Sequence, residues 1–460
     1  MGKYFGTDGI RAIIGQPIGD TEFGALLAYK TGRAAATALI SGAKGSGVQG
    51  RKPRVMVAKD TRVSGDMLVS AMAAGLTSAG ADVIILGVLP TPAVAYLTRK
   101  SGADIGAVIS ASHNLYEYNG IKLFGKDGYK LSDAVENLIE KLIDDDSGTL
   151  KPETQDLGRV RGNHGRWVAE YVDYVASKAE GRYRGKLAID CANGATFETA
   201  RSLFMQLGVN FDIFFDTPNG VNINYNCGST GIQSLQRIMV GGGFDLGISF
   251  DGDADRCLLV DEHGEIIDGD VILAVCARAM KNAGKLSGGA LVGTIISNAG
   301  MDVFAEQHGL VFHRADVGDR NVLEMMMMTG AKIGGESSGH TIFLDESTTG
   351  DGQLTAVMFL NALVASGKTA SELVADVPNF PQVMPSYHLR GGIEEKEAIM
   401  QDPRLHEEIA KQEKLLEGQG RIIVRPSGTE ALIRVLVEAK CKETATERAN
   451  HLIEFIDRLK

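Results

Sequence analysis

The chain has 460 residues, a net charge of −11, and 44% hydrophobic and 23% charged residues. This length exceeds what a single core organises and favours three or four domains. The negative charge, without a block of Lys and Arg, argues against a nucleic-acid partner. The N-terminus has no hydrophobic leader and no run of 18 apolar residues occurs, so we expect a cytoplasmic protein without a membrane span.

Cysteine usage also points to a reducing compartment. The five cysteines are odd in number and include no Cys-x-x-Cys pair, which is typical of neither a disulfide framework nor a zinc site.

Short apolar runs alternate with helix-like segments over roughly the first three quarters of the chain. Strands are predicted at 54–58, 82–86, 106–110, 186–190, 244–250, 291–296 and 310–313. Helices are predicted at 66–79, 132–143, 165–179 and 269–283. This alternation is typical of α/β units with mostly parallel sheets.

The pattern of predicted strands and helices changes after about residue 370. A strand at 383–390, a helix at 403–416, two strands at 422–425 and 432–438 and a terminal helix are predicted there. This order indicates a separate α+β domain. The polar, acidic stretch 144–156 marks an earlier domain boundary.

Several predicted strands end in small polar loops. These loops are 110–114, 191–194, 251–253, 297–300 and 335–340. Ligands of parallel sheets lie at the carboxyl ends of the strands. The recurrence therefore suggests several similar α/β units whose loops face one cleft.

The most informative segment is 251–256, which reads Asp-Gly-Asp-Ala-Asp-Arg. On an extended backbone, Asp251, Asp253 and Asp255 would point to one side and converge. A divalent cation would relieve their repulsion, and ligands with oxygen donors only suit Mg²⁺, Ca²⁺ or Mn²⁺. Because the flanking runs have strand character, we expect a metal loop between strands that serves chemistry on phosphate.

Two other interpretations of this segment stay open. An EF-hand loop would also have Asp at positions 1, 3 and 5, with Glu262 at position 12. Arg256, however, replaces the turn glycine, and helices should flank such a loop. The remaining alternative is a solvated acidic turn.

Three further loops offer groups that suit phosphate or sugar. Ser112 follows a predicted strand in Ser-Ala-Ser-His-Asn, and residues 335–340 read Gly-Glu-Ser-Ser-Gly-His, a mixture of donors and acceptors for hydroxyl groups. Residues 425–430 read Arg-Pro-Ser-Gly-Thr-Glu, where a guanidinium and backbone N–H groups can bind an anion. Each loop taken alone also has the composition of an ordinary turn.

Taken together and in this order, the four motifs resemble those of the α-D-phosphohexomutases. The resemblance runs from residue 4 to near the end of the chain. The branch that acts on glucosamine phosphate is the most similar, on the segments 4–11, 90–97, 222–224, 227–230 and 317–320.

The resemblance implies three similar α/β domains with mixed, mostly parallel sheets and a smaller C-terminal α+β domain around a central cleft. The expected domains are 1–155 with the phosphoserine loop, 156–256 with the metal loop, 257–372 with the sugar loop and 373–460 with the phosphate loop.

The resemblance also implies an isomerase that interconverts glucosamine 6-phosphate and glucosamine 1-phosphate through a phosphoserine and a bisphosphorylated sugar. Glucose or glucosamine 1,6-bisphosphate is the expected activator, and a homodimer is a possible assembly. The alternatives are the same chemistry on mannose or glucose phosphate, or a non-catalytic protein that binds Ca²⁺ or a phosphosugar.

Residue roles follow from the same resemblance. One Mg²⁺ is expected on Ser112, Asp251, Asp253 and Asp255. Groups around the transferred phosphoryl are expected at Arg11, His113, Lys122, Arg256 and His340, with Lys122 or His340 handling protons. Substrate binding is expected at Glu336, Ser338, Asp319, Arg320, Arg425, Ser427, Gly428 and Thr429, of which the last four hold the phosphate that is not transferred.

Three residues depart from the family pattern. Leu115 and Ala431 stand where proline is usual, and Asp316 stands where lysine is frequent. The charge reversal at Asp316 bears on sugar specificity more than on the type of reaction.

Overall fold

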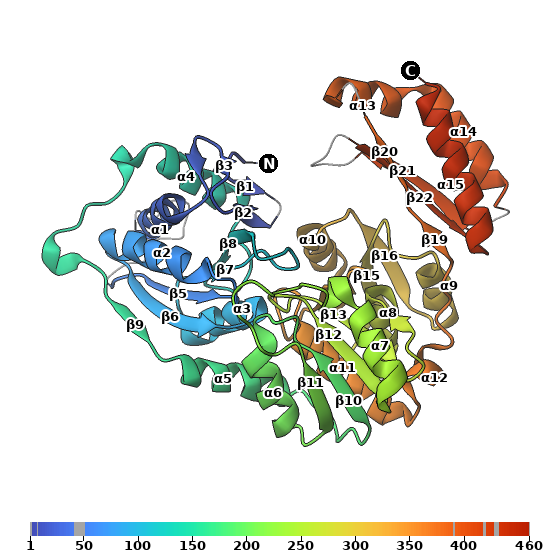
Figure 1. Cartoon of the computed structure of the whole chain (residues 1–460), viewed down its shortest axis with the longest axis horizontal. Helices are drawn as coiled ribbons and strands as arrows, with labels where there is room; N and C mark the ends of the chain where they lie inside the picture. Colours follow the sequence, from blue (N-terminus) through green and yellow to red (C-terminus); the bar gives the residue numbers. More distant parts are fainter. Residues whose placement is uncertain are drawn as a thin grey trace.

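The computed structural model describes residues 2–6, 8–40, 51–389, 392–416, 420–426 and 432–459. These residues form three α/β units, each with its own sheet, and a smaller C-terminal domain (Figure 1). The expected fold class is confirmed. None of the described helices is long and apolar enough to cross a membrane.

The first unit contains a sheet in the order β1-β2-β8-β7-β5-β6-β9 and a separate hairpin of β3 and β4. Its strands are β1 (Phe5–Gly6), β2 (Gly9–Ile13), β3 (Pro17–Ile18), β4 (Thr21–Glu22), β5 (Arg54–Lys59), β6 (Asp82–Val88), β7 (Ile105–Ile109), β8 (Tyr118–Gly125) and β9 (Val160–Gly162). Its helices are α1 (Ala25–Ile40), α2 (Gly65–Ser78), α3 (Thr91–Ser101) and α4 (Asp133–Asp144).

The second unit has the strand order β11-β10-β12-β13-β14. Its strands are β10 (Lys186–Asp190), β11 (Asn210–Phe214), β12 (Leu246–Phe250), β13 (Cys257–Asp261) and β14 (Ile266–Ile267). Its helices are α5 (His164–Ala176), α6 (Thr196–Gln206) and α7 (Gln233–Gly242).

The third unit has the strand order β16-β15-β17-β18. Its strands are β15 (Ala290–Thr294), β16 (Val311–Ala315), β17 (Ile333–Gly335) and β18 (Thr341–Phe343). The helices of this stretch of chain are α8 (Gly269–Asn282), α9 (Gly300–Gln307), α10 (Asp319–Thr329), α11 (Gly352–Ser366) and α12 (Ala370–Val374).

The C-terminal domain has the strand order β19-β22-β20, with β21 also paired to β22. Its strands are β19 (Gln382–Val383), β20 (Ser386–His388), β21 (Gly420–Pro426) and β22 (Leu432–Ala439), and its helices are α13 (Gly392–Gln401), α14 (Pro403–Lys414) and α15 (Lys442–Asp457). The single strand expected at 383–390 is instead two short strands. Pro385, which has no N–H to donate to a neighbouring strand, lies between them.

One four-strand topology occurs in all three α/β units. The orders β6-β5-β7-β8, β11-β10-β12-β13 and β16-β15-β17-β18 each contain two parallel pairings followed by one antiparallel pairing. The loops between the third and fourth of these strands therefore correspond to one another. We name them the serine loop (110–117), the acidic loop (251–256) and the histidine loop (336–340).

The three α/β units share packed surfaces. A single hydrophobic cluster includes Leu97 of the first unit, Ile248 of the second and Leu291 of the third. The central strands β7, β12, β13 and β15 are buried along their whole length, which explains their continuous apolar sequences. Helix α11 follows the third sheet in the chain but packs on β12 and β13 of the second and on α5.

The expected domain boundaries cut through this arrangement at two points. β9, at 160–162, pairs with β6 of the first sheet, beyond the boundary at 155. β13 pairs with β12 in the second sheet, beyond the boundary at 256. The sequence marks neither junction, because both depend on pairing between distant segments.

Polar contacts between described residues join the C-terminal domain to the third unit, beside which it lies in Figure 1. The Arg421 guanidinium contacts the buried Glu438 carboxylate and donates to the carbonyl of Ile295 at 2.9 Å. Glu438 in turn accepts from the N–H of Ala299 at 3.0 Å. The domain is thus fastened at the loop that follows β15.

Candidate active site and metal centre

The serine loop and the acidic loop meet, although their residues lie far apart in the sequence. The hydroxyl of Ser112 donates to Oδ2 of Asp251 at 2.6 Å. Ser112 is only 2% exposed. The nucleophile candidate and the acidic cluster therefore belong to one site, as the resemblance requires.

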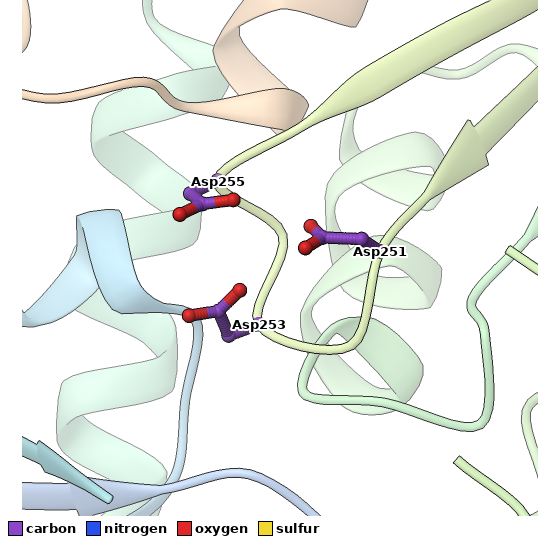
Figure 2. A group of neighbouring side chains, drawn as sticks. All are labelled: Asp251, Asp253 and Asp255. Atoms are coloured by element: carbon purple, nitrogen blue, oxygen red, sulfur yellow. The ribbon is translucent and has the colours of Figure 1, made fainter. Parts of the chain in front are cut away.

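The acidic loop brings three carboxylates together. The ligand atoms of Asp251, Asp253 and Asp255 lie within 4.8 Å of one another, and Figure 2 shows these side chains converging from a tight turn. We name them the aspartate cluster. The convergence was predicted, but on an extended segment; the loop is instead a turn, in which Ala254 has a φ of +57°.

Burial decides between the readings of this loop. Asp251 and Asp253 are fully buried and Asp255 is 7% exposed, so the aspartate cluster is not a solvated turn. An EF-hand does not fit either, because antiparallel strands flank the loop. Glu262 contacts the Ser371 hydroxyl at 2.6 Å and is not part of the cluster.

The donor set of the aspartate cluster fits a hard divalent cation. The buried Oδ1 atoms of Asp253 and Asp255 accept no hydrogen bond from a described residue, although Oδ1 of Asp255 lies at ion-pair distance, 3.9 Å, from Nε of Arg256. Burial and repulsion from the two neighbouring carboxylates raise the pKa of Asp251 well above its usual value. Buried carboxylate oxygens that accept no hydrogen bond need a compensating positive charge, and oxygen ligands favour Mg²⁺, Ca²⁺ or Mn²⁺.

Lys122 supplies part of that charge from strand β8. Its Nζ lies 2.9 Å from Oδ2 of Asp253, 3.5 Å from Oδ2 of Asp255 and 2.9 Å from Oδ2 of Asp8. Burial alone would lower the pKa of Lys122, but Asp253, Asp8 and Asp255 raise it well above its usual value. Lys122 is therefore an ammonium group in this arrangement.

Asp8 and Thr91 are site residues that the sequence reasoning missed. Asp8 contacts Nζ of Lys122, Nζ of Lys130 at 2.6 Å and a guanidinium nitrogen of Arg11 at 2.6 Å. Thr91, the first residue of α3, donates its hydroxyl to Oδ2 of Asp253 at 2.6 Å. Both belong to segments, 4–11 and 90–97, that carried the family resemblance, which was the available signal.

His113 and Arg256 adjoin the serine hydroxyl and the aspartate cluster. Nδ1 of His113 lies 3.3 Å from Oγ of Ser112. Burial, Arg256 and Arg11 lower the pKa of His113 to about 4, so the ring is neutral at pH 7. The buried Nε of Arg256 has no hydrogen-bond partner among the described residues, and an anionic ligand would provide one.

His340 stands at the end of the histidine loop. Its Nδ1 lies 3.8 Å from Oδ2 of Asp255, and its Nε2 accepts from the N–H of Gly350 at 3.1 Å. Burial lowers the pKa of His340, but Asp255, Asp319 and Glu336 outweigh this effect and raise it. The Gly350 contact favours the neutral ring with its proton on Nδ1, facing Asp255.

A cavity of about 340 Å³ lies where the three α/β units meet, and Asp255 of the aspartate cluster forms part of its wall. Seven of the predicted site residues line it: Arg11, Asp255, Arg256, Asp319, Glu336, Ser338 and His340. The cavity combines cations with hydroxyl and carboxylate groups, which suits a phosphorylated sugar.

Two predicted substrate residues lie elsewhere. Arg320 contacts Asp133 and donates to the carbonyl of Leu131 at 3.0 Å, so it joins the first and third units outside this cavity. Arg425 lies half-buried on β21 of the C-terminal domain, where burial and Arg434 lower its pKa. The remaining predictions, Ser427, Gly428, Thr429 and the departure at Ala431, lie outside the described residues.

Comparison with known families gives a consistent result over almost the whole chain. Models of the phosphoglucomutase/phosphomannomutase family match α/β/α domain I at residues 2–149, domain II at 169–264, domain III at 268–380 and the C-terminal domain at 390–454. The chain belongs to this family.

Individual relatives are similar over their full length. A phosphoglucosamine mutase of Acetivibrio thermocellus is 44% identical over 459 residues, which cover 99% of each chain. One of Clostridium botulinum (strain Eklund 17B) is 45% identical, again over 99% of each chain. A family member of known structure from Burkholderia thailandensis superposes with a TM-score of 0.79 at 24% identity, covering 98% of both chains, and shows that the fold is shared.

Proposed function

We propose that the protein interconverts glucosamine 6-phosphate and glucosamine 1-phosphate through a phosphorylated Ser112. The observation that carries this proposal is the hydrogen bond from the Ser112 hydroxyl to Asp251 within a buried cluster of carboxylates. Full-length relatives named phosphoglucosamine mutase support the choice of sugar.

The reaction consists of two phosphoryl transfers in opposite directions. In the first, the bond between phosphorus and the Ser112 oxygen breaks as a bond to a sugar hydroxyl forms, and the hydroxyl proton passes to the protein. The product is a bisphosphorylated sugar. After this sugar reverses its orientation, its other phosphoryl group returns to Ser112, and the freed sugar oxygen recovers a proton.

The cations of the site would neutralise charge during both transfers. Arg256, whose Nε donates no hydrogen bond to a described residue, and Arg11 at the cavity wall are placed to bind phosphoryl oxygens. Together with Ser112, the aspartate cluster would hold Mg²⁺, which when bound draws negative charge from the transferred group. Burial strengthens these interactions and excludes water that would otherwise hydrolyse the phosphoserine.

Proton transfer has two candidate residues. His340 lines the cavity and lies 3.8 Å from Asp255, and Lys122 lies behind the wall, 3.5 Å from the same Asp255 side chain. We infer that one of them exchanges a proton with the sugar hydroxyl, His340 directly or Lys122 after a small movement. Hydroxyl groups of the sugar would bind Glu336 and Ser338 on the cavity wall.

The phosphate that is not transferred would bind the C-terminal domain. Arg425 lies on β21, where burial and its cross-strand partner Arg434 on β22 lower its pKa, so an anion bound by the Arg425 guanidinium would be favourable there. We infer that Arg425, together with Ser427, Gly428 and Thr429, receives this phosphate. One fixed anion site and one fixed donor would then serve both ends of the sugar.

Intact mass measurement tests the mechanism. The purified protein is incubated with glucose 1,6-bisphosphate and should gain one phosphoryl group, while Ser112→Ala should gain none and should not turn over. A protein that binds the bisphosphate but never becomes phosphorylated would instead be the non-catalytic binding protein.

A second experiment tests the sugar. Glucosamine, glucose and mannose 6-phosphates are compared by kcat/KM under identical conditions. The proposal expects the 2-amino sugar to be preferred. A clear preference for either 2-hydroxyl sugar would move the assignment to a phosphoglucomutase or phosphomannomutase activity with the same chemistry.

A further inference from the structure

The backbone carbonyls of the serine loop are held by two side chains from different units. Arg62 comes from the loop between β5 and α2 in the first unit, and Asn224 comes from the loop that follows β11 in the second. Each donates to the same two carbonyl oxygens, those of Ser112 and Asn114. Both lone pairs of each oxygen are thereby used.

Arg62 is fully buried and rigidly fixed. Its Nε donates to Oδ2 of Asp60 at 2.8 Å, so the buried charge is paired. Its terminal nitrogens donate to the carbonyl of Ser112 at 2.9 Å, to that of Asn114 at 2.8 Å and to that of Leu115. The planar guanidinium thus serves three carbonyls at once, a geometry that the single ammonium of a lysine does not reproduce.

Asn224 completes the arrangement from the opposite side. Its Nδ2 lies 2.9 Å from both carbonyl oxygens, and its own backbone has a φ of +58°. Asn224 is 4% exposed, and its buried Oδ1 has no hydrogen-bond partner among the described residues. The contacts of this side chain are therefore concentrated on the serine loop.

Asp60 extends the same network to the N–H of the nucleophile. The Ser110 hydroxyl donates to Oδ2 of Asp60 at 2.7 Å and accepts from the N–H of Ser112 at 3.0 Å. The N–H and the C=O of Ser112 are thus both restrained by buried groups that lead back to Asp60.

This restraint coincides with an unfavourable backbone conformation. Ser112 has a φ of +51°, which is rare for a residue other than glycine and costs free energy unless the surroundings enforce it. With this backbone, its hydroxyl lies 2.6 Å from Asp251. A relaxed serine loop would direct the hydroxyl elsewhere.

We propose that Arg62 and Asn224 are positioning residues that hold Ser112 in the left-handed conformation and so aim its oxygen at the aspartate cluster. The inference rests on the proposed function, since it assumes that Ser112 is the group that carries the phosphoryl. Neither residue lines the substrate cavity, so their effect should fall on the transfer step and not on substrate binding.

The decisive test compares two identical substitutions on one loop. Asn224→Gly removes the amide but tolerates the positive φ. Asn226→Gly is the matched control, because Asn226 lies two residues further, has a φ of +52° and is exposed. Measurements are kcat, KM for glucosamine 6-phosphate, melting temperature, and the single-turnover rate of Ser112 phosphorylation by glucose 1,6-bisphosphate.

Asn224→Gly should lower kcat and the phosphorylation rate about tenfold with KM unchanged, as expected for about 1.4 kcal/mol lost in the transition state. Asn226→Gly should match the wild type. Equal rates for the two variants, or a loss in Asn224→Gly confined to KM, would overturn the proposal. If the wild type itself is never phosphorylated, the proposed function fails first.

Arg62→Lys provides a second variant. It keeps the positive charge beside Asp60 but loses the branched donors, and we expect kcat to fall about 100-fold, the effect of a misplacement of about 1 Å. Should this buried substitution prevent folding, Asn224→Gly alone decides. A folded Arg62→Lys with wild-type kcat would contradict the assignment.

Discussion

The serine loop and the acidic loop occupy the same topological position in two units. They differ in how completely their buried polar groups are hydrogen-bonded and their charges are paired. In the serine loop, the N–H and C=O groups of Ser112 are hydrogen-bonded, and the nearby buried charge of Arg62 is paired with Asp60. In the acidic loop, the buried Oδ1 atoms of Asp253 and Asp255 accept no hydrogen bond from a described residue, and the pKa of Asp251 is raised. The first loop is complete within the protein; the second requires a ligand.

This difference separates two properties of a loop: its position, which the fold determines, and the ligand that it binds, which its charges determine. The repeated topology places three loops at one end of three sheets, but it does not determine what they bind. That depends on whether the charges at the loop are balanced internally, as in the serine loop, or left unbalanced, as in the acidic loop. Substitutions that restore or remove charge balance should therefore have different effects at the two loops.

The largest effect is expected from Asp253→Asn in the acidic loop. The substitution removes one negative ligand and weakens the contact with Lys122, so kcat at saturating Mg²⁺ should fall on the order of 1000-fold. Asp261→Asn is the control, because Asp261 is a buried carboxylate at the far end of β13 and belongs to no group of metal-ligating side chains among the described residues. Equal kcat values in the two variants would refute the metal assignment.

The second largest effect is expected at Asp190, a buried carboxylate that can be compared with Asp60, the ion-pair partner of Arg62. Asp190 is the last residue of β10, and among the described residues it accepts from the N–H groups of Ala192 and Gly228 and from the hydroxyl of Ser249. Without a cation, burial raises the pKa of Asp190 to about 7. Its contribution to stability is thus complete below about pH 4 and is lost as the pH rises through 7, by roughly 4 kcal/mol in total.

Chemical denaturation of the wild type and Asp190→Asn between pH 4 and 8 measures this contribution. The difference in the free energy of unfolding between the two proteins should change steadily from pH 4 to 7. A difference that does not vary with pH would show that Asp190 is already ionised in the folded protein.

A third effect concerns cation binding without catalysis. Since the carboxylates of the aspartate cluster repel one another, Mg²⁺ should stabilise the folded state by about 2.7 kcal/mol at 100 times its dissociation constant. The melting temperature should rise with Mg²⁺ in the wild type and fall back with EDTA. The same titration of Asp253→Asn should give a much smaller rise, and equal rises would place the cation elsewhere.

The smallest effect is expected at Asp316. This exposed residue directly precedes Val317 and Gly318 of the cavity wall. Asp316→Lys should lower KM for glucosamine 6-phosphate up to about fivefold, the range of an exposed ion pair. Glu306→Lys, the same charge change on the exposed surface of α9, should leave KM unchanged; a similar drop in both would indicate a general effect of net charge.

Much of this architecture was accessible from the sequence. Continuous apolar runs gave the central strands, and β10 at Lys186–Asp190 has the predicted limits. The strands were found because strand periodicity is a local signal. That Ser112 and Asp251 meet was implied by the family resemblance, which short motifs at the ends of strands carried.

The supporting residues could not be found in the same way. Asp8 reaches Lys122 because β2 pairs antiparallel with β8, a register that depends on residues more than 100 positions apart. Asn224 looks like a turn former, since its positive φ and its contact with Ser112 are properties of the assembled units. Such contacts depend on tertiary packing, which composition and spacing do not encode.

Helix α11 connects the second and third units, and this connection limits where the chain can be cut into fragments that fold separately. It begins at the acidic loop, where the N–H of Gly352 donates to the carbonyl of Ala254 at 2.9 Å, and it covers strands that precede it by about 100 residues. A fragment ending after the second sheet would keep α7 on that sheet but would expose the apolar surface that α11 covers, and so be prone to aggregate. Recombination between homologous genes should accordingly be tolerated before the C-terminal domain more readily than between the units that α11 joins.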